Sequence, residues 1–291
     1  MCSGGGRVDH EESADSGLLR SGVSRLAAAG VAEPALEAAR LLRRACELGP
    51  PDLGRQAFNR MVTQRERHMP LEYIEGSTTF MGHDFAVDQR VQVTRPAMQA
   101  FVRIGATMVE RVAVTRGQAQ VPVIDVGTGS GALAIMLALS QDAAQPVYAT
   151  DLSPDALDVA NANVMAAGLA ERIVLREGSL LDPVPEPVGL VMANLPFVSQ
   201  GMRDLLEPGV AEYEPSMAVF GAGESGWSLQ HELLEQVSRR AELPDAIIVT
   251  FHVSQEEEAM AAAASFTGYQ ASVQELRPGW SGVLILARLA H

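Results

Sequence analysis

Lysine is absent from this chain of 291 residues, so arginine provides all 22 of its permanently basic side chains. Aspartate and glutamate together number 36, and the formal net charge at pH 7 is −14. Proteins that bind duplex or structured RNA normally make many phosphate contacts from a basic surface. The sequence shows no basic patch of that kind, and we therefore expect no nucleic-acid partner.

Cysteine and long apolar segments are also scarce. The chain has two cysteines, Cys2 and Cys46, which excludes a disulfide framework and fits a reducing cytoplasm. The six histidines lack the spacing of metal ligands, so no metal site is predicted. The longest strongly apolar run, Ala132–Leu139, is far too short to cross a bilayer, and the N-terminal residues contain no apolar signal-peptide core. We expect a soluble cytoplasmic protein without membrane contact.

The chain is long enough for one large domain and a smaller one, and its composition changes along its length. Residues 1–16 have too little apolar content to order them, which predicts a disordered tail. Residues 17–76 carry apolar side chains at helical spacing and form a predicted helical domain. Residues 77–96 have the pattern of a β-hairpin, and residues 97–291 form the large domain.

Helical and strand periods alternate beyond residue 96. Strands are predicted at 122–126, 146–150, 172–176, 188–193, 245–251, 270–276 and 282–288. Helices are predicted at 97–113, 130–140, 154–167, 227–241 and 254–266. This alternation predicts an α/β fold with a mostly parallel sheet covered by helices on both faces. The last two strands are joined around Pro278-Gly279 and predict an antiparallel hairpin at the edge of the sheet.

A glycine-rich turn follows the first strand of the large domain. The segment Asp125-Val-Gly-Thr-Gly-Ser-Gly131 allows the backbone to turn sharply and to approach a ligand closely. The spacing Gly127-x-Gly129-x-x-Ala132 also satisfies a relaxed dinucleotide fingerprint. On these residues alone, NAD, S-adenosylmethionine and a helix start without a ligand all stay open.

Two acidic residues narrow this choice. Asp151 ends the next predicted strand, where its carboxylate can accept hydrogen bonds from two ribose hydroxyls, as NAD and S-adenosylmethionine both require. Asp151 can also cap the helix that starts near Ser153. Asp125 stands two residues before the first glycine, where an acid can hold the loop and face the cationic methionine end of S-adenosylmethionine. We therefore favour S-adenosylmethionine as the cofactor.

The segment Asn194-Leu-Pro-Phe197 follows another apolar strand and indicates the type of reaction. The asparagine oxygen and the next backbone carbonyl can accept both N–H hydrogens of an amide or amine. Phe197 can stack on the planar group, and Pro196 stiffens the turn. An amide nitrogen is a weak nucleophile that needs orientation more than a base. These residues favour methyl transfer to nitrogen, although a structural Asn-x-Pro turn at a strand end is the alternative.

Several further motifs occur in order with these segments, and together they resemble the HemK/PrmC protein-glutamine N5-methyltransferases from about Gly17 to Arg288. The additional segments are Pro70-Leu-Glu-Tyr-Ile74, Phe80–Val91, Arg95-Pro96, Asn161-x-Asn163, Tyr213-Glu-Pro215 and Gly221–Gly226. The resemblance implies a class I methyltransferase with a Rossmann-like seven-stranded sheet. It also implies that residues 17–76 recognise the substrate and that the hairpin at residues 77–96 acts as a hinge.

The resemblance also implies roles for individual residues. Asn194, Leu195, Pro196 and Phe197 would hold the acceptor as the catalytic residues. The residues that would bind S-adenosylmethionine are Phe80, Gly82, Arg95, Asp125, Gly127, Thr128, Gly129, Gly131, Asp151, Leu152, Ser179, Leu180 and Asn194.

The chain departs from the family at several positions. Where the family has Asn-Pro-Pro-Tyr, this chain has Leu195 and Phe197 in place of the first proline and the tyrosine. Arg95-Pro96 lacks the glutamate that follows in the family, Ser179 replaces an acidic residue, and Phe251-His-Val253 stands in place of Glu-x-Gly. The cofactor chemistry survives these changes, including the one at Ser179, while the acceptor site is altered.

Three functions follow. The favoured hypothesis is a divergent member that methylates a nitrogen of a small-molecule acceptor, as in specialised metabolism. The alternative is methylation of the glutamine of peptide chain release factors. The third is a binding or scaffold protein with an idle cofactor site. The sequence does not assign roles to His83, Glu214 or His252, and it does not indicate an oligomeric state.

Overall fold

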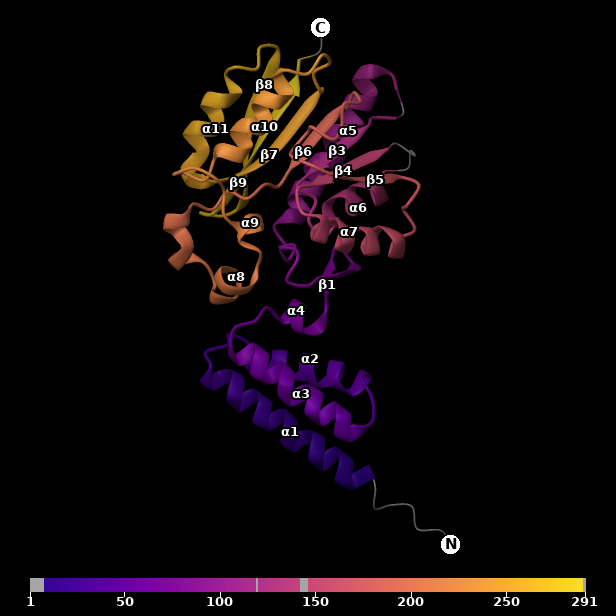
Figure 1. Ribbon diagram of the computed structural model, residues 1–291, viewed down its shortest axis with the longest axis vertical. Coiled ribbons are helices and arrows are strands. Elements are labelled where there is room, and N and C mark those ends of the chain that lie inside the picture. The colour runs from indigo at the N-terminus through magenta and orange to yellow at the C-terminus, as the bar shows by residue number, and fades with distance from the viewer. Residues whose placement is uncertain (1–7, 119, 142–145, 290–291) are drawn as a thin grey trace. The chain divides into compact units, whose positions relative to one another are not determined.

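The computed structural model divides into two units, and buried strands form the centre of the larger one (Figure 1). The side chains of these strands alternate between two packed faces. The structure describes residues 8–118, 120–141 and 146–289. Unit 1 contains the chain up to Gly76 together with Pro208–Tyr213. Unit 2 contains Ser77–Glu207 and the chain from Glu214 onward.

Unit 2 contains a seven-stranded sheet in the order β5-β4-β3-β6-β7-β9-β8. Its strands are β3 (Val123–Val126), β4 (Val147–Asp151), β5 (Ile173–Glu177), β6 (Leu190–Ala193), β7 (Ala246–His252), β8 (Tyr269–Arg277) and β9 (Ser281–Arg288). Neighbouring strands from β5 to β7 are parallel, while β9 is antiparallel to both β7 and β8. The predicted fold class, strands and closing antiparallel hairpin are confirmed.

Helices cover both faces of this sheet. They are α5 (Met98–Arg116), α6 (Ala132–Leu139), α7 (Pro154–Ala166), α10 (Ser228–Ser238) and α11 (Glu256–Ala263). Strand β6 shows how the faces alternate, because Leu190 and Met192 pack with α5 and α6, while Val191 and Ala193 pack with α10 and α11. Burial on both faces explains why the parallel strands are continuous apolar runs. None of the described helices has both the length and the apolar character that a membrane span requires.

A two-stranded hairpin precedes the sheet in the chain. Strands β1 (Ser77–Phe80) and β2 (His83–Ala86) are antiparallel and joined by Met81 and Gly82, which both have positive φ, of 51° and 83°. Two consecutive positive φ angles are typical of the tight turns that match the twist of paired strands. Val91–Val93, which lies within the stretch predicted as a hairpin, is not a strand.

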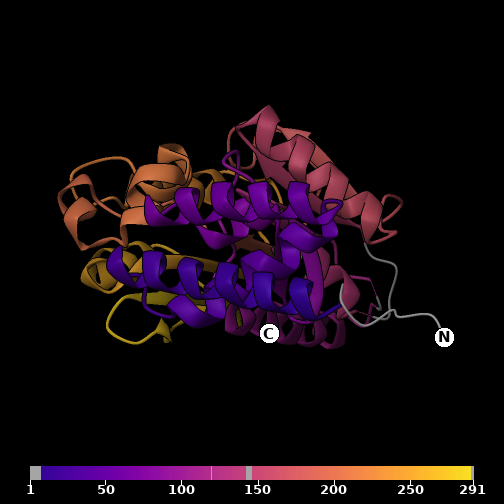
Figure 2. The same cartoon turned by 90° about the horizontal axis from the view of Figure 1, so that it is seen from below.

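Unit 1 is helical. It contains α1 (Val8–Ala28), α2 (Pro34–Glu47), α3 (Pro51–Glu66), α4 (Leu71–Glu75) and α8 (Pro208–Tyr213). Helices α1 to α3 lie side by side (Figure 2) around a core that includes Leu26, Leu41 and Phe58. The ring of Phe58 lies so close to Gly22 that a Cβ atom there would stand 2.5 Å from it, so a glycine lets α1 approach α3.

Two of the predicted boundaries need correction. Helix α1 begins at Val8, so residues 8–16 are helical where we expected a disordered tail, while residues 1–7 lie outside the described part of the chain. This stretch has no proline, and Glu11, Glu12 and Ala14 favour a helix even without an apolar face. The segment Pro208–Tyr213 groups with unit 1 although the sequence analysis assigned it to the large domain. The Tyr213 hydroxyl donates to the Arg67 carbonyl oxygen at 2.9 Å, a contact between residues 146 positions apart.

The chain continues between β6 and α10 through short helices. These are the 3₁₀-helix η1 (Gln200–Leu205), α8 of unit 1 and α9 (Ser216–Val219), and a second 3₁₀-helix, η2 (Val253–Gln255), follows β7. The loops after β3, β4, β5, β6 and β7 leave the same edge of the sheet because these strands are parallel. Ligands of open α/β sheets bind at this edge. Most of the predicted site residues lie in these loops or at the strand ends before them, whereas Phe80, Gly82 and Arg95 belong to the hairpin and to the segment that leads from it to α5.

Candidate active site

The glycine turn between β3 and α6 is fixed by the neighbouring strand β4. The backbone N–H groups of Gly127 and Thr128 both donate to the Thr150 carbonyl oxygen at 2.9 Å. Gly127, Gly129 and Gly131 have φ angles of 72°, 54° and 77°, a region that disfavours side chains. A Cβ atom at Gly131 would also lie 3.3 Å from the Cβ of Ala160 in α7, so this glycine serves helix packing.

Asp125 is buried at the end of β3, with an exposed fraction of 1%. Its Oδ2 accepts a hydrogen bond from the Thr128 hydroxyl at 2.8 Å, and its Oδ1 has no hydrogen-bond partner among the described residues. Burial raises the pKa of Asp125 to about 6, the hydrogen bond from Thr128 opposes this rise, and the charge of Asp151 adds to it. A buried acceptor oxygen without a partner beside a glycine turn fits the cationic end of S-adenosylmethionine.

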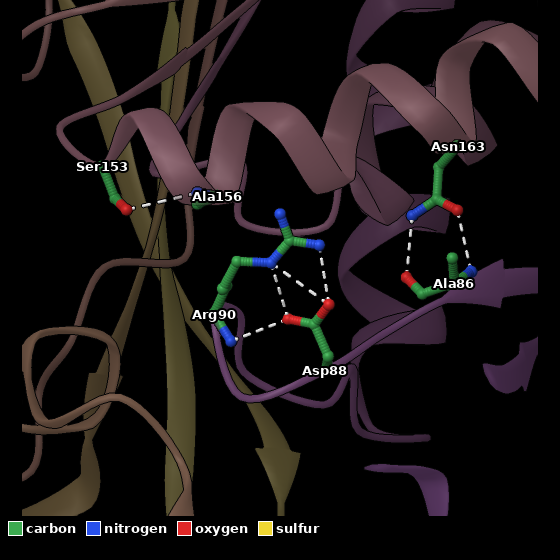
Figure 3. A network of polar contacts seen from close by, with 6 residues as sticks. All are labelled: Ala86, Asp88, Arg90, Ser153, Ala156 and Asn163. Atoms are coloured by element: carbon green, nitrogen blue, oxygen red, sulfur yellow. Dashed lines mark hydrogen bonds and ion pairs between the residues drawn. The ribbon is translucent and has the colours of Figure 1, made fainter. Parts of the chain in front are cut away.

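Asp151 lies at the end of β4 and supports the same turn. Its Oδ2 accepts from the Gly129 N–H and its Oδ1 from the Ser153 N–H, both at 2.9 Å. The cap of α7 is Ser153 itself, whose hydroxyl accepts from the Ala156 N–H at 3.2 Å (Figure 3). Each carboxylate oxygen of Asp151 keeps acceptor capacity beyond its one backbone bond. The carboxylate therefore fits ribose hydroxyls as well as supporting the turn.

The loop after β5 brings Leu180 to β4. Leu180 is buried with a φ of 49°, and its carbonyl oxygen accepts from the Thr150 hydroxyl at 2.9 Å. Ser179, beside it, is half-buried. Leu152, which follows Asp151, is 61% exposed and so offers an apolar surface at this edge of the sheet. We call the loops with Asp125–Gly131, Asp151 and Leu180 the cofactor half of the site.

The hairpin is joined to the cofactor half through Asn163 of α7. Its Nδ2 donates to the Ala86 carbonyl oxygen at 3.0 Å, and its Oδ1 accepts from the Ala86 N–H at 2.8 Å (Figure 3). The same Nδ2 donates to the Ser130 carbonyl oxygen at 2.8 Å. Asn163 belongs to a motif that the sequence analysis noted without a role. Ala86 and Ser130, the hydrogen-bond partners of Asn163, are far from it in the sequence. The residues next to Asn163 therefore give no indication of this role.

Phe80 and Gly82 both have structural roles in the hairpin. Phe80 is buried in the core, where its ring packs edge-on against Phe85 with 6.4 Å between centroids. Gly82 forms the exposed hairpin turn, and His83 beside it is also exposed. After the hairpin, the carboxylate of Asp88 and the guanidinium of Arg90 form a local ion pair of 2.7 Å (Figure 3). The adjacent Arg90 guanidinium lowers the pKa of Asp88.

Arg95 pairs with Glu214, a residue 119 positions further along the chain. The Glu214 side chain is completely buried, and the side chain of Arg95 is 40% exposed. A buried carboxylate needs such a partner to remain charged. The pair gives Glu214 a structural role at the end of the insert between β6 and α10. It also engages the guanidinium of Arg95, which the family resemblance assigned to the cofactor.

We call Asn194–Phe197 the acceptor half of the site, and polar side chains from three distant positions hold it. The Thr250 hydroxyl donates to Asn194 Oδ1 at 3.0 Å. Gln230 Nε2 donates to the Pro196 carbonyl oxygen at 3.1 Å and lies 3.5 Å from that of Leu195. Gln255 Nε2 donates to the Phe197 carbonyl oxygen at 2.9 Å. The contact to the Leu195 carbonyl oxygen is long, so this oxygen can still accept a further hydrogen bond.

The glycine cluster after α9 packs on the backbone of the acceptor half. A Cβ atom at Gly221 would lie 2.7 Å from the Pro196 carbonyl oxygen, and one at Gly226 would lie 2.6 Å from that of Phe197. Gln255 bonds this cluster as well, because its Nε2 donates to the Ser225 carbonyl oxygen at 2.6 Å. The absence of side chains at Gly221 and Gly226 therefore allows the glycine cluster to pack directly against the backbone of Asn194–Phe197.

His252 belongs to the turn that holds Gln255 in place. Its backbone N–H donates to Gln255 Oε1 at 2.8 Å, and its Nδ1 lies 2.8 Å from the Ser254 hydroxyl. The ring packs edge-on against Trp280 with 4.9 Å between centroids, and burial lowers the pKa of His252. These contacts give His252 a structural role.

The two halves of the site touch. Strands β3 and β6 are adjacent and parallel, with Val126 opposite Ala193, so the two loops leave the sheet side by side. A Cβ atom at Gly127 would lie 3.1 Å from Leu195 Cδ2, so the leucine packs directly on the glycine turn. The arrangement brings a site suited to a cationic cofactor next to a pair of acceptor oxygens. The structure thus joins Asp125, Gly127, Asp151 and Asn194 at one edge of the sheet.

The sequence analysis missed Thr250, Gln230 and Gln255, all of which are completely buried. Thr250 had a detectable signal, since it is a hydroxyl within the apolar strand β7. The two glutamines had none, because a glutamine in an amphipathic helix or turn is usually exposed.

Comparisons with known proteins find similarity to methyltransferases. A family model described as ribosomal protein L11 methyltransferase (PrmA) matches residues 107–207. The release factor glutamine methyltransferase of Deinococcus radiodurans is 31% identical over 278 residues, which cover 91% of this chain and 94% of that protein. The ribosomal protein uL3 glutamine methyltransferase of Bordetella pertussis is 36% identical over 178 residues, covering 61% of this chain and 56% of that protein.

A solved structure shares the fold. The catalytic domain of human METTL16, crystallised with the MAT2A 3′UTR hairpin 6, superimposes with a TM-score of 0.52 at 12% identity, covering 80% of this chain and 81% of that chain.

Proposed function

The chain belongs to the release factor glutamine methyltransferase family, and on this premise we propose that it methylates the side-chain amide nitrogen of a glutamine in a peptide chain release factor. It is an S-adenosylmethionine-dependent methyltransferase of α/β fold. The observation that carries the proposed acceptor is the pair of oxygens at the end of β6, Asn194 Oδ1 and the Leu195 carbonyl, beside the cofactor half.

These two oxygens suit a primary amide. A glutamine side chain has two N–H hydrogens, and accepting both fixes the plane of the amide and the direction of its nitrogen lone pair. Bound S-adenosylmethionine supplies a methyl group activated by a positively charged sulfur. An amide nitrogen is a poor nucleophile, so fixing its position supplies a large part of the rate. Phe197, which is half-buried, can stack on the amide plane.

The acceptor distinguishes this proposal from our first hypothesis. Leu195 and Phe197 suggested a small-molecule acceptor, but the relative that matches nearly the whole chain is named for a release factor glutamine. Both substitutions preserve what the mechanism uses, since leucine still has a backbone carbonyl and phenylalanine still has a ring. The small-molecule acceptor has no support among the relatives, and we replace it with the protein glutamine.

We also propose that unit 1 recognises the protein acceptor. The match to the Deinococcus relative spans 91% of this chain, so it includes most of the helical unit. A glutamine within a folded protein is recognised through more surface than the methylated side chain offers, and a separate helical unit provides such surface.

The proposal is tested with the full-length protein and methyl-labelled S-adenosylmethionine. The acceptors are purified release factor, purified ribosomal proteins and a small-molecule extract from the source organism, assayed in parallel. We expect the label on one glutamine of the release factor, located by mass spectrometry, and no label when that glutamine is replaced. Label that enters only the small-molecule fraction would overturn the proposal. The Asn194→Ala protein serves as the matched inactive control.

A further inference from the structure

One hydroxyl inside an otherwise apolar strand contacts the acceptor half of the site. Strand β7 has the sequence Ala-Ile-Ile-Val-Thr-Phe-His, and all seven residues are buried. Thr250 has no exposed surface. Its position follows from the register, because Val249 lies opposite Ala193, and the next residues along the chain are Thr250 in β7 and Asn194 immediately after β6. The distance from Thr250 Oγ1 to Asn194 Oδ1 is 3.0 Å.

This contact favours one orientation of the Asn194 amide. A threonine hydroxyl can donate to an amide oxygen or accept from an amide nitrogen. If the amide were turned over, Nδ2 would face Thr250 and the hydroxyl hydrogen would lose the acceptor it has now. The described part of the chain gives this hydrogen no other acceptor. A buried donor without a partner is costly, so the hydroxyl favours the orientation that presents Oδ1.

We infer that Thr250 is a positioning residue that fixes the orientation of the Asn194 amide for methyl transfer. The inference rests on the proposed function, in which Asn194 Oδ1 accepts an N–H of the glutamine amide. Oδ1 has two lone pairs, so it can accept from Thr250 and from the acceptor amide together. A turned amide would instead present its own N–H hydrogens to those of the acceptor. Thr250 thus acts on the reaction through Asn194 and without contact to the substrate.

The test compares Thr250→Val, which keeps the shape and removes the hydroxyl, with Thr250→Ser, which keeps the hydroxyl. With release factor as acceptor, we expect kcat of the valine variant to fall about 10-fold to 50-fold while the cofactor Kd stays within about threefold. The serine variant should stay within about threefold of the unchanged protein in kcat. Thermal melts of both variants measure any loss of folding.

A second buried threonine provides a matched control. Thr150 is also completely buried, and its hydroxyl donates to the Leu180 carbonyl oxygen in the cofactor half. Thr150→Val removes the same chemical group, and its effect should be on cofactor Kd rather than on kcat at saturating cofactor. If Thr250→Val lowers kcat and Thr150→Val weakens cofactor binding, the effect at Thr250 comes from positioning of the acceptor half. A general loss of packing would give both variants the same effect.

A double-mutant cycle with Asn194→Ala separates this inference from the proposed function. In the Asn194→Ala background, Thr250→Val should change turnover by less than about twofold because its partner is gone. If Asn194→Ala is inactive and Thr250→Val retains kcat, the positioning role is wrong and the proposed function stands. Equal losses in Thr250→Val and Thr250→Ser also contradict the role. If Asn194→Ala itself turns over release factor normally, the role assigned to Asn194 is wrong and the inference fails with it. The proposed function fails on a different result, namely that the unchanged protein places no label on the release factor.

Discussion

In the cofactor half of the site, Asp125 is held by a residue three positions away, whereas in the acceptor half the Phe197 carbonyl is held by a residue 58 positions away. The glycine turn, its acid and the neighbouring strand end form a nearly local unit. The loop at Asn194–Phe197 depends on Gln230, Thr250 and Gln255, which belong to other elements. The cofactor half is therefore supported by its own motif and by the elements that follow it in the chain, β4 and α7. The acceptor half is supported by side chains from more distant elements.

This difference predicts where substitutions act. Changes in the cofactor half should affect cofactor affinity, and changes to the distant supports should affect folding and turnover.

Replacing Gln255 with alanine should have the largest effect on stability. Its completely buried side chain makes hydrogen bonds to Phe197, Ser225 and His252, of which the bond to His252 is buried and the other two are partly buried. Losing these bonds leaves three backbone groups without this partner and creates a cavity, and we expect the free energy of unfolding to fall by roughly 3–5 kcal/mol. Chemical denaturation measures the change. The exposed Gln274 on β8 provides the control, and equal effects of Gln255→Ala and Gln274→Ala would contradict the assigned support.

Replacing Asp125 with asparagine should stabilise the protein without cofactor. Burial raises the folded-state pKa of Asp125 from 3.8 to about 6, so the folded protein holds a proton more tightly than the unfolded chain. The free energy of unfolding therefore falls as the pH rises from the unfolded-state pKa of 3.8 through the folded-state pKa of about 6. The loss is on the order of 3 kcal/mol at pH 7 and above. Asparagine removes this cost, so its benefit should be largest above pH 7 and vanish near pH 4.

Thermal melts across this pH range measure the effect, with the exposed Asp158→Asn as the control. The same Asp125→Asn protein should bind S-adenosylmethionine more weakly. If the difference in stability between Asp125→Asn and the unchanged protein is the same at pH 4 and at pH 8, the electrostatic explanation for Asp125 is wrong.

Replacing Asp151 with alanine should weaken cofactor binding by about 1–3 kcal/mol, the range for hydrogen bonds to a charged group. Calorimetric titration measures the Kd. The substitution also removes the bond to the Gly129 N–H, so part of the effect comes from the glycine turn. If the Kd for the cofactor is unchanged, Asp151 does not contribute to cofactor binding.

The double variant Leu195→Pro, Phe197→Tyr should have the smallest effect. It restores the Asn-Pro-Pro-Tyr sequence while keeping both the backbone carbonyl and the ring. We expect kcat/KM with release factor to stay within about threefold, because neither replaced group makes the acceptor hydrogen bonds. A gain of a hundredfold would show instead that the natural residues select a different acceptor.

The sequence predicted much of the sheet because parallel strands buried on both faces are continuous apolar runs, as in Leu190–Ala193. It also pointed to Asp125, Asp151 and Asn194, since each lies near or just after the end of such a strand, and their roles stay predictions. The supports of the acceptor half escaped prediction because the burial of Gln230 and Gln255 is decided by tertiary packing. The pairing of Arg95 with Glu214 escaped for the same reason, being a contact across 119 positions.

The most direct test of the account is the Asn194→Ala variant, assayed for methyl transfer to release factor and titrated calorimetrically with S-adenosylmethionine. We predict that turnover falls by about 10²-fold to 10³-fold while the cofactor Kd changes by less than about threefold, since the acceptor half orients the amide and the cofactor half binds the cofactor. Near-normal turnover, or a loss of cofactor affinity as large as the loss of turnover, would contradict this division of the site.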